Sequence, residues 1–320
     1  MRSVDVGPEW NPDDDASVGV EPDQDPVGQR RRFASAILPA WARKSPQMSA
    51  EATSSVRTGT LAQVMATLRP SMDRRAREWR TGFVTNSRSV VVSGGGSGMG
   101  RAIAEAFAAA GDSVLILGRR ADKLAEVASS TGGRHVACDL SNAEDVAAAA
   151  ESFDKIEVLV NCAGGRSRRK GRDLGTIRQR WTDDFETNVL TVVLLTEAAF
   201  PHFAPGARLI TIGSIAAWRG NDSYGAVKAA LHGWNHGVVP RMAAIGGTSN
   251  IVVPGFVSGT EFFGIELTEA DLARRAGESL LGRVGQVDDI VGMVTYLASP
   301  AAGFVTGQIL GVNGGAVLGR

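Results

Sequence analysis

The sequence predicts a doubly wound α/β domain, in which helices cover both faces of a parallel sheet. From residue 88 onward, short apolar runs rich in Val, Ile and Leu alternate with longer helical segments. Nearly continuous apolar strands of this kind are typical of parallel strands that are buried on both sides. A glycine-rich turn, SGGGSGMG, also joins the first apolar run to the first helical segment. These two features define the expected fold class.

The expected elements follow one another as strand, turn and helix along this part of the chain. Each strand is an apolar, often β-branched run, and the first helical segment stops at a glycine. A further helix is expected to carry Tyr224 and Lys228, and the whole domain is expected to span residues 88–320. We expect strands at residues 89–96, 113–117, 135–140, 156–164, 208–214, 249–255 and 308–315, and helices at residues 101–111, 121–130, 143–153 and 287–299.

The composition is that of an ordinary globular protein. The 320 residues are 43% hydrophobic and 21% charged with zero net charge, so nothing global favours binding to nucleic acid or to a membrane surface. No apolar run reaches the length of about 18 residues that a transmembrane helix needs. The acidic start lacks the basic and apolar regions of a secretory signal, and we expect a cytoplasmic protein. The two cysteines, Cys138 and Cys162, are expected to be buried thiols, and no metal site is expected.

Residues 1–87 differ from the rest of the chain and are expected to form a largely disordered N-terminal extension. The first 25 residues carry eight acids, one arginine and several prolines, and such a segment buries little apolar surface. The charge then reverses, with eleven basic and three acidic side chains in residues 30–80. Residues 31–49 faintly resemble a segment of mutator-type transposases, without that family's catalytic acids. A fusion remnant or misassigned start and a functional arm both fit this extension.

The glycine turn is suited to a dinucleotide. Gly94, Gly98 and Gly100 have the spacing G-x-x-x-G-x-G. Glycines there let the backbone approach a pyrophosphate, while the start of the following helix supplies amide donors. A purely structural turn is the alternative, but a strand before the turn and a helix after it favour nucleotide binding.

The end of the second strand indicates which dinucleotide binds. An acidic residue there would bind the ribose 2′-hydroxyl of NAD. Instead Gly118 is followed by Arg119 and Arg120, whose guanidinium groups suit the 2′-phosphate of NADP. We therefore expect NADP, with NAD possible if the two arginines are only solvated. At the end of the third strand, Asp139 is placed to accept a hydrogen bond from the adenine amino group.

Tyr224 and Lys228 are four residues apart on a predicted helix, so their side chains share a face. Ser214 precedes them at the end of a predicted strand. A phenol has an ordinary pKa of about 10, and a lysine cation one turn away is expected to lower it. Such a phenol suits proton transfer to or from a substrate oxygen. A tyrosine that merely packs against a lysine stem is the alternative.

From about Ser87 to Arg320 the chain resembles the single-domain short-chain dehydrogenases/reductases, and it is most similar in character to 3-oxoacyl-carrier-protein reductases. The resemblance implies a Rossmann-type fold, an NAD(P)-dependent interconversion of an alcohol and a carbonyl, a small-molecule substrate and a homo-oligomer, either a dimer or a tetramer. The motifs that carry it occur in the family's order: SGGGSGMG, DL at 139–140, NCAG at 161–164, Asn188 within WTDDFETNVL, Ser214, YGAVK at 224–228, PGFV at 254–257 and GFVTGQILGVNGG near the C-terminus.

The resemblance also implies the role of each site residue. Tyr224 would be the general acid/base, Ser214 would hold the substrate oxygen, and Lys228 would bind the nicotinamide ribose. Asn188 would support a water-linked proton relay, so these four residues form the expected catalytic set. The expected cofactor-binding set consists of Gly94, Ser97, Gly98, Met99, Gly100, Arg119, Arg120, Asp139, Leu140, Asn161, Ala163, Gly164, Tyr224, Lys228, Pro254, Gly255 and Val257.

Several features depart from the family's usual pattern. Ser214 and Tyr224 are ten residues apart, which is a shorter spacing than the family usually has. Thr260 lies one residue farther from the preceding PG motif, at residues 254–255, than is usual in the family. Gly237 and Pro240 fall within the helix that carries Tyr224. Since an interior proline costs about 3 kcal/mol, we expect this helix to kink or end there, which would disturb a face that commonly packs against a sister subunit.

The loop after the fourth expected strand, GGRSRRKGRD at 164–173, carries five basic residues. A solvated loop and a surface that steers an acidic substrate, such as a carrier protein or a coenzyme A ester, both fit this composition.

An oxidoreductase is the expected function. The alternative is a non-catalytic nucleotide-binding sensor or interaction protein of the same fold, and the complete catalytic set argues against it. A nucleic-acid binder would rest on the N-terminal basic stretch alone. A sugar-nucleotide epimerase would need a larger C-terminal lobe than the residues after Lys228 provide.

Removal of residues 1–85 should leave both the melting temperature and the affinity for NADPH unchanged, because the extension is expected to add nothing to the core of the domain. Thermal unfolding and a fluorescence titration of the truncated and full-length proteins measure the two quantities. A clear drop in either value would show that the extension packs on the domain.

Overall fold

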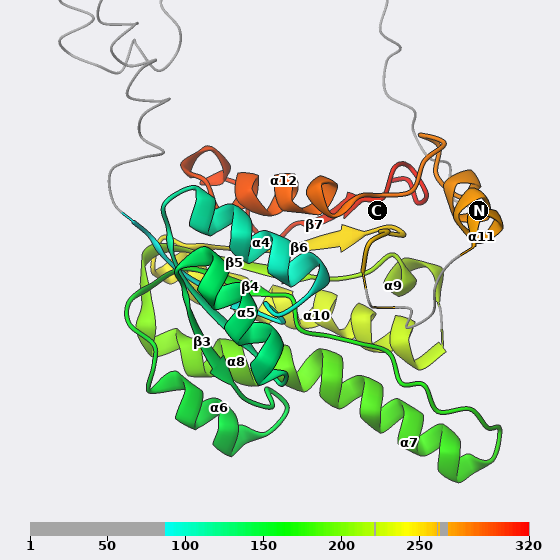
Figure 1. Ribbon diagram of the computed structural model, residues 1–320, viewed down its shortest axis with the longest axis horizontal. Helices are drawn as coiled ribbons and strands as arrows, with labels where there is room; N and C mark the ends of the chain where they lie inside the picture. Colours follow the sequence, from blue (N-terminus) through cyan, green and yellow to red (C-terminus); the bar gives the residue numbers. More distant parts are fainter. Residues whose placement is uncertain (1–86, 221, 261, 263–267, 320) are drawn as a thin grey trace, which may run out of the picture. The chain divides into compact units, whose positions relative to one another are not determined.

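The computed structural model describes residues 87–220, 222–260, 262 and 268–319. The expectations for residues 1–86, including the disorder, the basic stretch and the transposase-like segment, fall outside these ranges. All seven expected strands are present and form a single sheet (Figure 1). Their bounds are β1 Ser89–Ser93, β2 Ser113–Gly118, β3 Arg134–Ala137, β4 Ile156–Asn161, β5 Phe203–Ile212, β6 Thr248–Pro254 and β7 Ile309–Val312.

The strand order across the sheet is β3-β2-β1-β4-β5-β6-β7, and every neighbouring pair is parallel. The chain builds one half of the sheet outward from β1 to β3 and then crosses back to β4. The loops that follow β1 and β4 therefore leave the sheet at a topological switch point, where ligands bind in sheets of this kind. The predicted doubly wound Rossmann-type fold is confirmed.

Helices cover both faces of the sheet. In the described ranges, α7 and α8 are joined without a break by a π-helical segment, η2, so that they form one long rod. The bounds are α4 Gly98–Ala109, α5 Ala121–Thr131, α6 Ala143–Ala150, α7 Leu174–Phe185, η2 Glu186–Leu190, α8 Thr191–Ala199, α9 Ala216–Arg219, α10 Asp222–Ala244, α11 Glu269–Gly277 and α12 Val287–Leu297, with short 3-10 turns η3 at Phe200–His202 and η5 at Pro300–Ala302.

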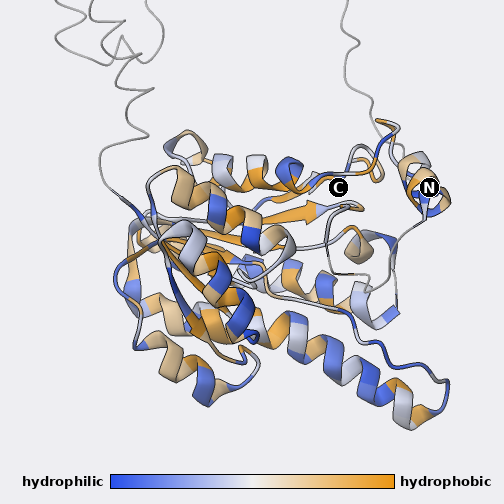
Figure 2. Cartoon of the chain, viewed as in Figure 1, coloured by the Kyte–Doolittle hydropathy of each residue, from blue (hydrophilic) through white to orange (hydrophobic). Residues whose placement is uncertain are grey.

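The side chains of each strand alternate between two apolar layers. Val90 and Val92 of β1 pack in the layer that contains α4, α5 and α12, whereas Val91 packs in the layer that contains α6, α8 and the end of α10. Figure 1 shows α4 and α12 on one side of the sheet and α6, α8 and α10 on the other. Hydrophobic residues are concentrated on the strands between these layers (Figure 2), as expected for parallel strands buried on both faces.

Helix α10 does not end at Pro240, which was one of the two outcomes expected there, and it runs on to Ala244. Pro240 is exposed and lies only one turn before the end of the helix, so the backbone hydrogen bond that it removes is on the solvent side. Val238 and Met242, on the opposite side, are 3% and 0% exposed within the core. The apolar packing of this last turn therefore holds the helix together across the proline.

No helix in the described ranges is long and apolar enough to cross a membrane. Over the same ranges, no three His, Cys, Asp or Glu side chains lie close enough together to hold a metal ion.

Candidate active site

A cleft of about 840 Å³ lies at the carboxyl ends of the strands. Its lining comes from the loops that follow six of the seven strands, from β1 to β6. Every predicted cofactor-binding residue except Asn161 lines it, as do the predicted catalytic residues Ser214, Tyr224 and Lys228. The parallel topology thus brings together residues that are separated by more than half of the described chain.

The glycine loop forms the floor of the cleft between β1 and α4. Gly94 has a φ of 70°, and a Cβ atom there would lie only 2.9 Å from the Cα of Ala163 in the loop after β4. A Cβ at Gly100 would collide with the carbonyl oxygen of Gly94. Only glycine therefore allows the two loops at the switch point and the start of α4 to pack this closely.

The start of α4 is suited to binding an anion. Ser97 is the N-cap residue, but its side chain makes no capping hydrogen bond, and no acidic residue lies in the first turn. The first amide groups of α4 therefore keep their hydrogen-bonding capacity and their positive potential for a ligand. The residues at this end of the cleft fit the pyrophosphate of a dinucleotide.

The two arginines after β2 differ in their surroundings. Arg120 donates a 2.6 Å hydrogen bond from its guanidinium to the Ser97 hydroxyl, which ties the end of β2 to the glycine loop. Arg119 is exposed, and its charge acts on Asp139 across the gap between the β2 and β3 ends. Two hydrogen bonds from Ser141 and, more weakly, the charge of Arg119 hold the pKa of Asp139 below its ordinary value. Asp139 is therefore ionised at neutral pH and able to accept hydrogen bonds.

Ser214 and Tyr224 both line the other end of the cleft, and the Ser214 side chain lowers the pKa of the Tyr224 phenol. The short helix α9 fills the interval between them and returns the chain to the start of α10, so the shorter spacing still brings the serine to the tyrosine. The Ser214 hydroxyl oxygen also accepts a 3.1 Å hydrogen bond from the amide of Ala216. The ring of Phe262 lies beside the Tyr224 ring, with their centroids 5.4 Å apart.

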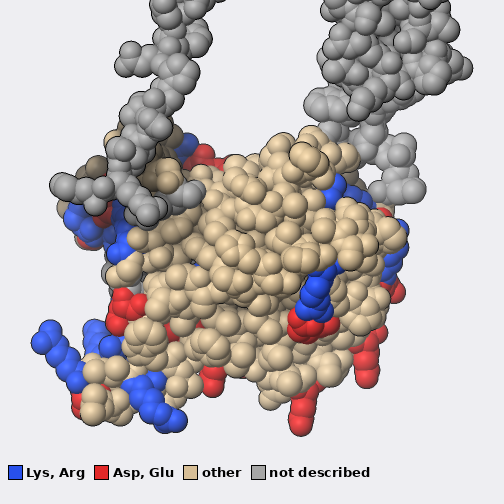
Figure 3. Space-filling view, turned by 180° about the vertical axis from the view of Figure 1, so that it is seen from behind, with Lys and Arg blue, Asp and Glu red and all other residues tan. Residues whose placement is uncertain are grey.

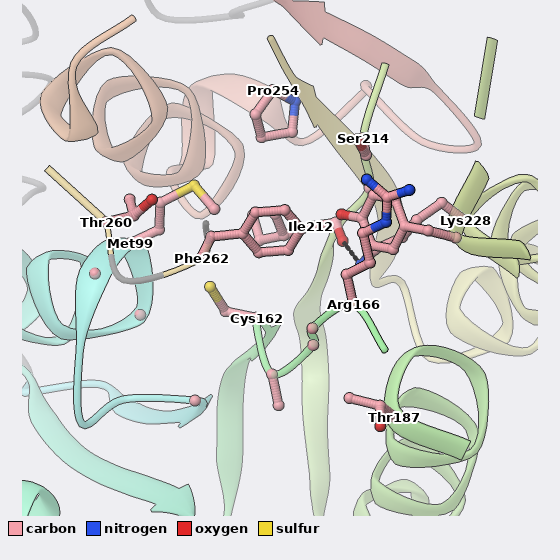
Figure 4. A pocket seen from close by; sticks show the side chains of 18 of the residues that line it. Met99, Cys162, Arg166, Thr187, Ile212, Ser214, Lys228, Pro254, Thr260 and Phe262 are labelled. Atoms are coloured by element: carbon pink, nitrogen blue, oxygen red, sulfur yellow. Dashed lines mark hydrogen bonds between the residues drawn. The ribbon is translucent and has the colours of Figure 1, made fainter. Parts of the chain in front are cut away.

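Lys228 lies one turn along α10 from Tyr224, and both side chains are buried, with 5% and 8% of their surfaces exposed. The Lys228 ammonium donates a 3.0 Å hydrogen bond to the carbonyl oxygen of Ile212 at the end of β5 (Figure 4). Asn188 and Lys228 approach Gly164 from the same side, since a Cβ there would lie 2.9 Å from the Asn188 Oδ1 and 3.3 Å from the Lys228 Nζ.

Burial has the largest effect on the pKa values of Tyr224 and Lys228. It raises the pKa of Tyr224 to about 12, against the hydrogen bond from Ser214 and the positive charge of Arg166, which both lower it. Burial also lowers the pKa of Lys228 to about 8. In the protein alone the pKa of the phenol is thus raised rather than lowered, contrary to expectation, because loss of hydration outweighs the nearby positive charges.

The two asparagines of the predicted set do not line the cleft. Asn188 is fully buried in η2, where its side-chain amide donates to the carbonyl oxygens of Gly165 (2.7 Å) and Asp184 (2.9 Å) and accepts from the Gly165 amide at 3.2 Å. Asn161 is buried at the end of β4 and donates to the Thr196 hydroxyl of α8 at 3.0 Å. Both side chains therefore brace the elements around the cleft, and the water-linked relay through Asn188 stays a prediction.

Several residues that line the cleft were not in the predicted set. Arg166 extends into the cleft near Ser214 and Lys228, and Phe262 and Thr260 come from the segment after β6 (Figure 4). The basic loop at residues 164–173 was the signal for Arg166, but five basic residues in one loop do not show which of them turns inward. The half-buried Cys162 also lines the cleft, and burial raises the pKa of its thiol to about 12.

The fold and the cleft define a nucleotide-binding oxidoreductase. A family profile described as enoyl-(acyl carrier protein) reductase matches residues 94–317. The 3-oxoacyl-[acyl-carrier-protein] reductase of Escherichia coli is 31% identical over 245 residues, which cover 70% of this chain and 95% of that protein. The 2,3-dihydroxy-2,3-dihydro-p-cumate dehydrogenase of Pseudomonas putida is 30% identical over 255 residues, which cover 75% and 98% of the two chains.

A solved structure supports the same assignment. The blue fluorescent protein from a metagenomic library in complex with NADPH matches with a TM-score of 0.64 and 29% identity, over 73% of this chain and 99% of that one. The chain belongs to the short-chain dehydrogenase/reductase family. It is an NAD(P)-dependent oxidoreductase of that family.

Lys228→Met should stabilise the cofactor-free protein at pH 7 by about 1–3 kcal/mol, because it removes a buried charge. The ammonium has a pKa of about 8 in the folded protein, against 10.5 for an ordinary lysine. The unfolded chain therefore binds more protons between these two pH values, and the free energy of unfolding of the unaltered protein should rise across this window relative to that of the variant. Urea unfolding of both proteins at pH 7 and pH 9.5 measures this change. Parallel pH dependence in the two proteins would show that Lys228 is not desolvated.

Proposed function

We propose that the enzyme interconverts an alcohol and a carbonyl by using NADP, with Tyr224 as the general acid/base. One observation carries this proposal: Ser214, Tyr224 and the buried Lys228 line one end of the cleft, and the glycine loop lines the other end. A substrate oxygen that contacts both hydroxyl groups would lie beside the nicotinamide of a dinucleotide bound along the cleft. The small-molecule substrate is therefore expected to carry a carbonyl or hydroxyl group that fits between Ser214 and Tyr224.

Proton transfer in the reducing direction follows from the protonation state of Tyr224. Since burial raises the pKa of the phenol to about 12, it holds its proton at neutral pH until a substrate oxygen takes it. The Ser214 hydroxyl donates a second hydrogen bond to the same oxygen as negative charge develops there. When bound, the nicotinamide supplies the hydride for reduction or accepts it in oxidation.

In the oxidising direction Tyr224 must first lose its proton, and its raised pKa opposes this step in the protein alone. Two cations that line the cleft with Tyr224 are available to assist, Lys228 one turn along α10 and Arg166 in the loop after β4, whose charge lowers the pKa of the phenol. We therefore expect alcohol oxidation to accelerate as the pH rises above neutrality, whereas carbonyl reduction should vary little there.

NADP rather than NAD is proposed because of the charges at the end of β2. Arg119 and Arg120 line the cleft there, and Arg120 is already oriented by its hydrogen bond to Ser97. A ribose 2′-phosphate would gain a charge-assisted hydrogen bond from Arg119. The relative solved in complex with NADPH supports this choice.

Tyr224→Phe should lower kcat by roughly a hundredfold or more, because the substitution removes the transferable proton and little else. Affinity for NADPH should stay within about twofold of the unaltered value, since the phenol is proposed to act on the substrate. Absorbance of NADPH during turnover of a carbonyl panel and a fluorescence titration measure the two quantities. Tyr296→Phe is the matched control, because this other tyrosine lies on α12 with 45% of its surface exposed. Near-normal activity of Tyr224→Phe would refute the acid/base role.

NADPH should bind at least tenfold more tightly than NADH, and Arg119→Ala should remove most of this difference, because one charge-assisted contact contributes roughly 1.5–3 kcal/mol. Fluorescence titrations with both cofactors at a fixed salt concentration measure the ratio. Arg134→Ala is the control, since Arg134 pairs with Asp154 on the protein surface. Equal affinities for the two cofactors, or a preference for NADH, in the unaltered protein would refute the assignment of NADP as the cofactor.

A further inference from the structure

Arg166 lacks the side-chain partner that several other basic residues around the cleft have. Arg219 and Arg275 both pair with Glu278, at 2.8 and 3.0 Å, and Arg120 is bound to Ser97. No hydrogen bond or ion pair links the Arg166 guanidinium to another residue of the described ranges. The guanidinium nevertheless extends into the cleft toward Ser214 and Lys228 (Figure 4).

The backbone on both sides of Arg166 is fixed. Gly165 exchanges two hydrogen bonds with the fully buried Asn188 side chain, at 2.7 and 3.2 Å. On the other side, the Ser167 amide donates a 2.6 Å hydrogen bond to Asp184, which is 1% exposed, and the Ser167 hydroxyl donates to Asp183 at 2.9 Å. Arg166 therefore projects from an anchored point, and little of its backbone freedom would be lost on binding a ligand.

Arg168 of this basic loop also lines the cleft, whereas Arg169 and Lys170 do not. Figure 3 shows Lys and Arg side chains gathered at the end of the molecule where the loop meets the start of α7. Arg169 pairs there with Asp183 at 2.6 Å, and Lys170 is exposed beyond it. The composition of the loop therefore does not show that Arg166 and Arg168 line the cleft while Arg169 and Lys170 lie outside it.

The charge of Arg166 acts at the position of the reaction. It lowers the pKa of Tyr224, although burial prevails. The one carboxylate that lines this end of the cleft in the described ranges is Glu278, and it already accepts hydrogen bonds from Arg219, Arg274 and Arg275. The charge of Asp184 also reaches Tyr224, but this carboxylate is 1% exposed and already accepts hydrogen bonds from the Ser167 amide and the Ser223 hydroxyl. The Arg166 guanidinium is therefore left for a ligand, and its planar shape suits a carboxylate through two parallel hydrogen bonds.

We propose that the substrate is an oxo acid, or the corresponding hydroxy acid, whose free carboxylate binds Arg166 while its carbonyl oxygen contacts Ser214 and Tyr224. This assignment rests on the proposed function and adds the substrate class to it. In reduction, bound NADPH would supply the hydride for the new C–H bond at the carbonyl carbon, and Tyr224 would give the proton for the new O–H bond. The carboxylate is unchanged by the reaction and serves to orient the substrate.

The test compares oxo acids with their methyl esters, which keep the carbonyl and lose the charge. Reduction by NADPH is measured with acetoacetate, a longer aliphatic 3-oxo acid and benzoylacetate, each beside its ester. The unaltered enzyme should prefer the acid by at least about tenfold in kcat/KM. Arg166→Ala should lower kcat/KM roughly ten- to a hundredfold more for the acid than for the ester, mainly through KM, because any effect of the lost charge on Tyr224 falls on both substrates alike. An ester preference in the unaltered enzyme, or an acid preference that survives in Arg166→Ala, would overturn the assignment.

Two matched variants separate a contact from general attraction. Lys170→Ala removes the same charge from the same loop without touching the cleft, so it should leave the preference for the acid intact. Arg166→Lys should restore only part of the preference, because an ammonium lacks the planar fork of the guanidinium. An equal loss in Lys170→Ala and Arg166→Ala would indicate long-range steering by the loop and would refute the contact.

Binding separates failure of this assignment from failure of the proposed reaction. Calorimetry with the NADP-bound protein measures the affinity for the same acids without turnover. Acids that bind to the unaltered protein and not to Arg166→Ala, with no NADPH consumed, would uphold the recognition site and refute the proposed reaction. Turnover of neutral carbonyls, with no binding of any acid of the panel, would refute the oxo-acid assignment and leave the reaction standing.

Discussion

The buried face of α10 is the constraint on which the rest of the site depends. Lys228 is almost fully removed from water, and its hydrogen bond to the Ile212 carbonyl partly replaces the lost hydration. Loss of this partner would leave an uncompensated buried charge, which is strongly destabilising. The end of β5 and the second turn of α10 must therefore stay together. Ser214, two residues beyond Ile212, is carried to Tyr224 by the same contact.

A second group of buried polar side chains holds the site without lining it. Asp184 accepts a 2.6 Å hydrogen bond from the hydroxyl of Ser223, the residue before Tyr224, and another from the Ser167 amide in the loop after β4. One carboxylate thus joins the start of α10 to the loop that carries Arg166. Asn188 completes the arrangement from η2, and π-helical segments of this kind are frequent at functional sites. Because these bonds are buried, the positions of Arg166 and Tyr224 depend on the same anchors.

The sequence predicted the sheet well because all seven strands are apolar runs between turn residues. It did not reveal α7, since only Asp184 is buried among the residues of that helix and no apolar stripe marks it. Of the kink or end expected at Pro240, the end does not occur, because the burial of Val238 and Met242 outweighs the local effect of the proline. Ser214, Tyr224 and Lys228 could be found from their spacing and order. The inward turn of Arg166 could not, because it follows from hydrogen bonds to Asn188 and Asp184, which are distant in sequence.

The electrostatics of the cleft link its two ends. The chain has no net charge, yet the uncapped start of α4 and Arg119 make one end of the cleft positive, and Arg166 and Lys228 make the other end positive. The negative side chains of the protein balance only part of this positive charge. Charged groups that are buried or lie close together usually have partners of opposite charge, so the cleft departs from this rule. A cleft of this kind gains most from ligands that carry negative charge at both ends, and an anionic dinucleotide beside an anionic substrate satisfies that requirement with the residues the chain already provides.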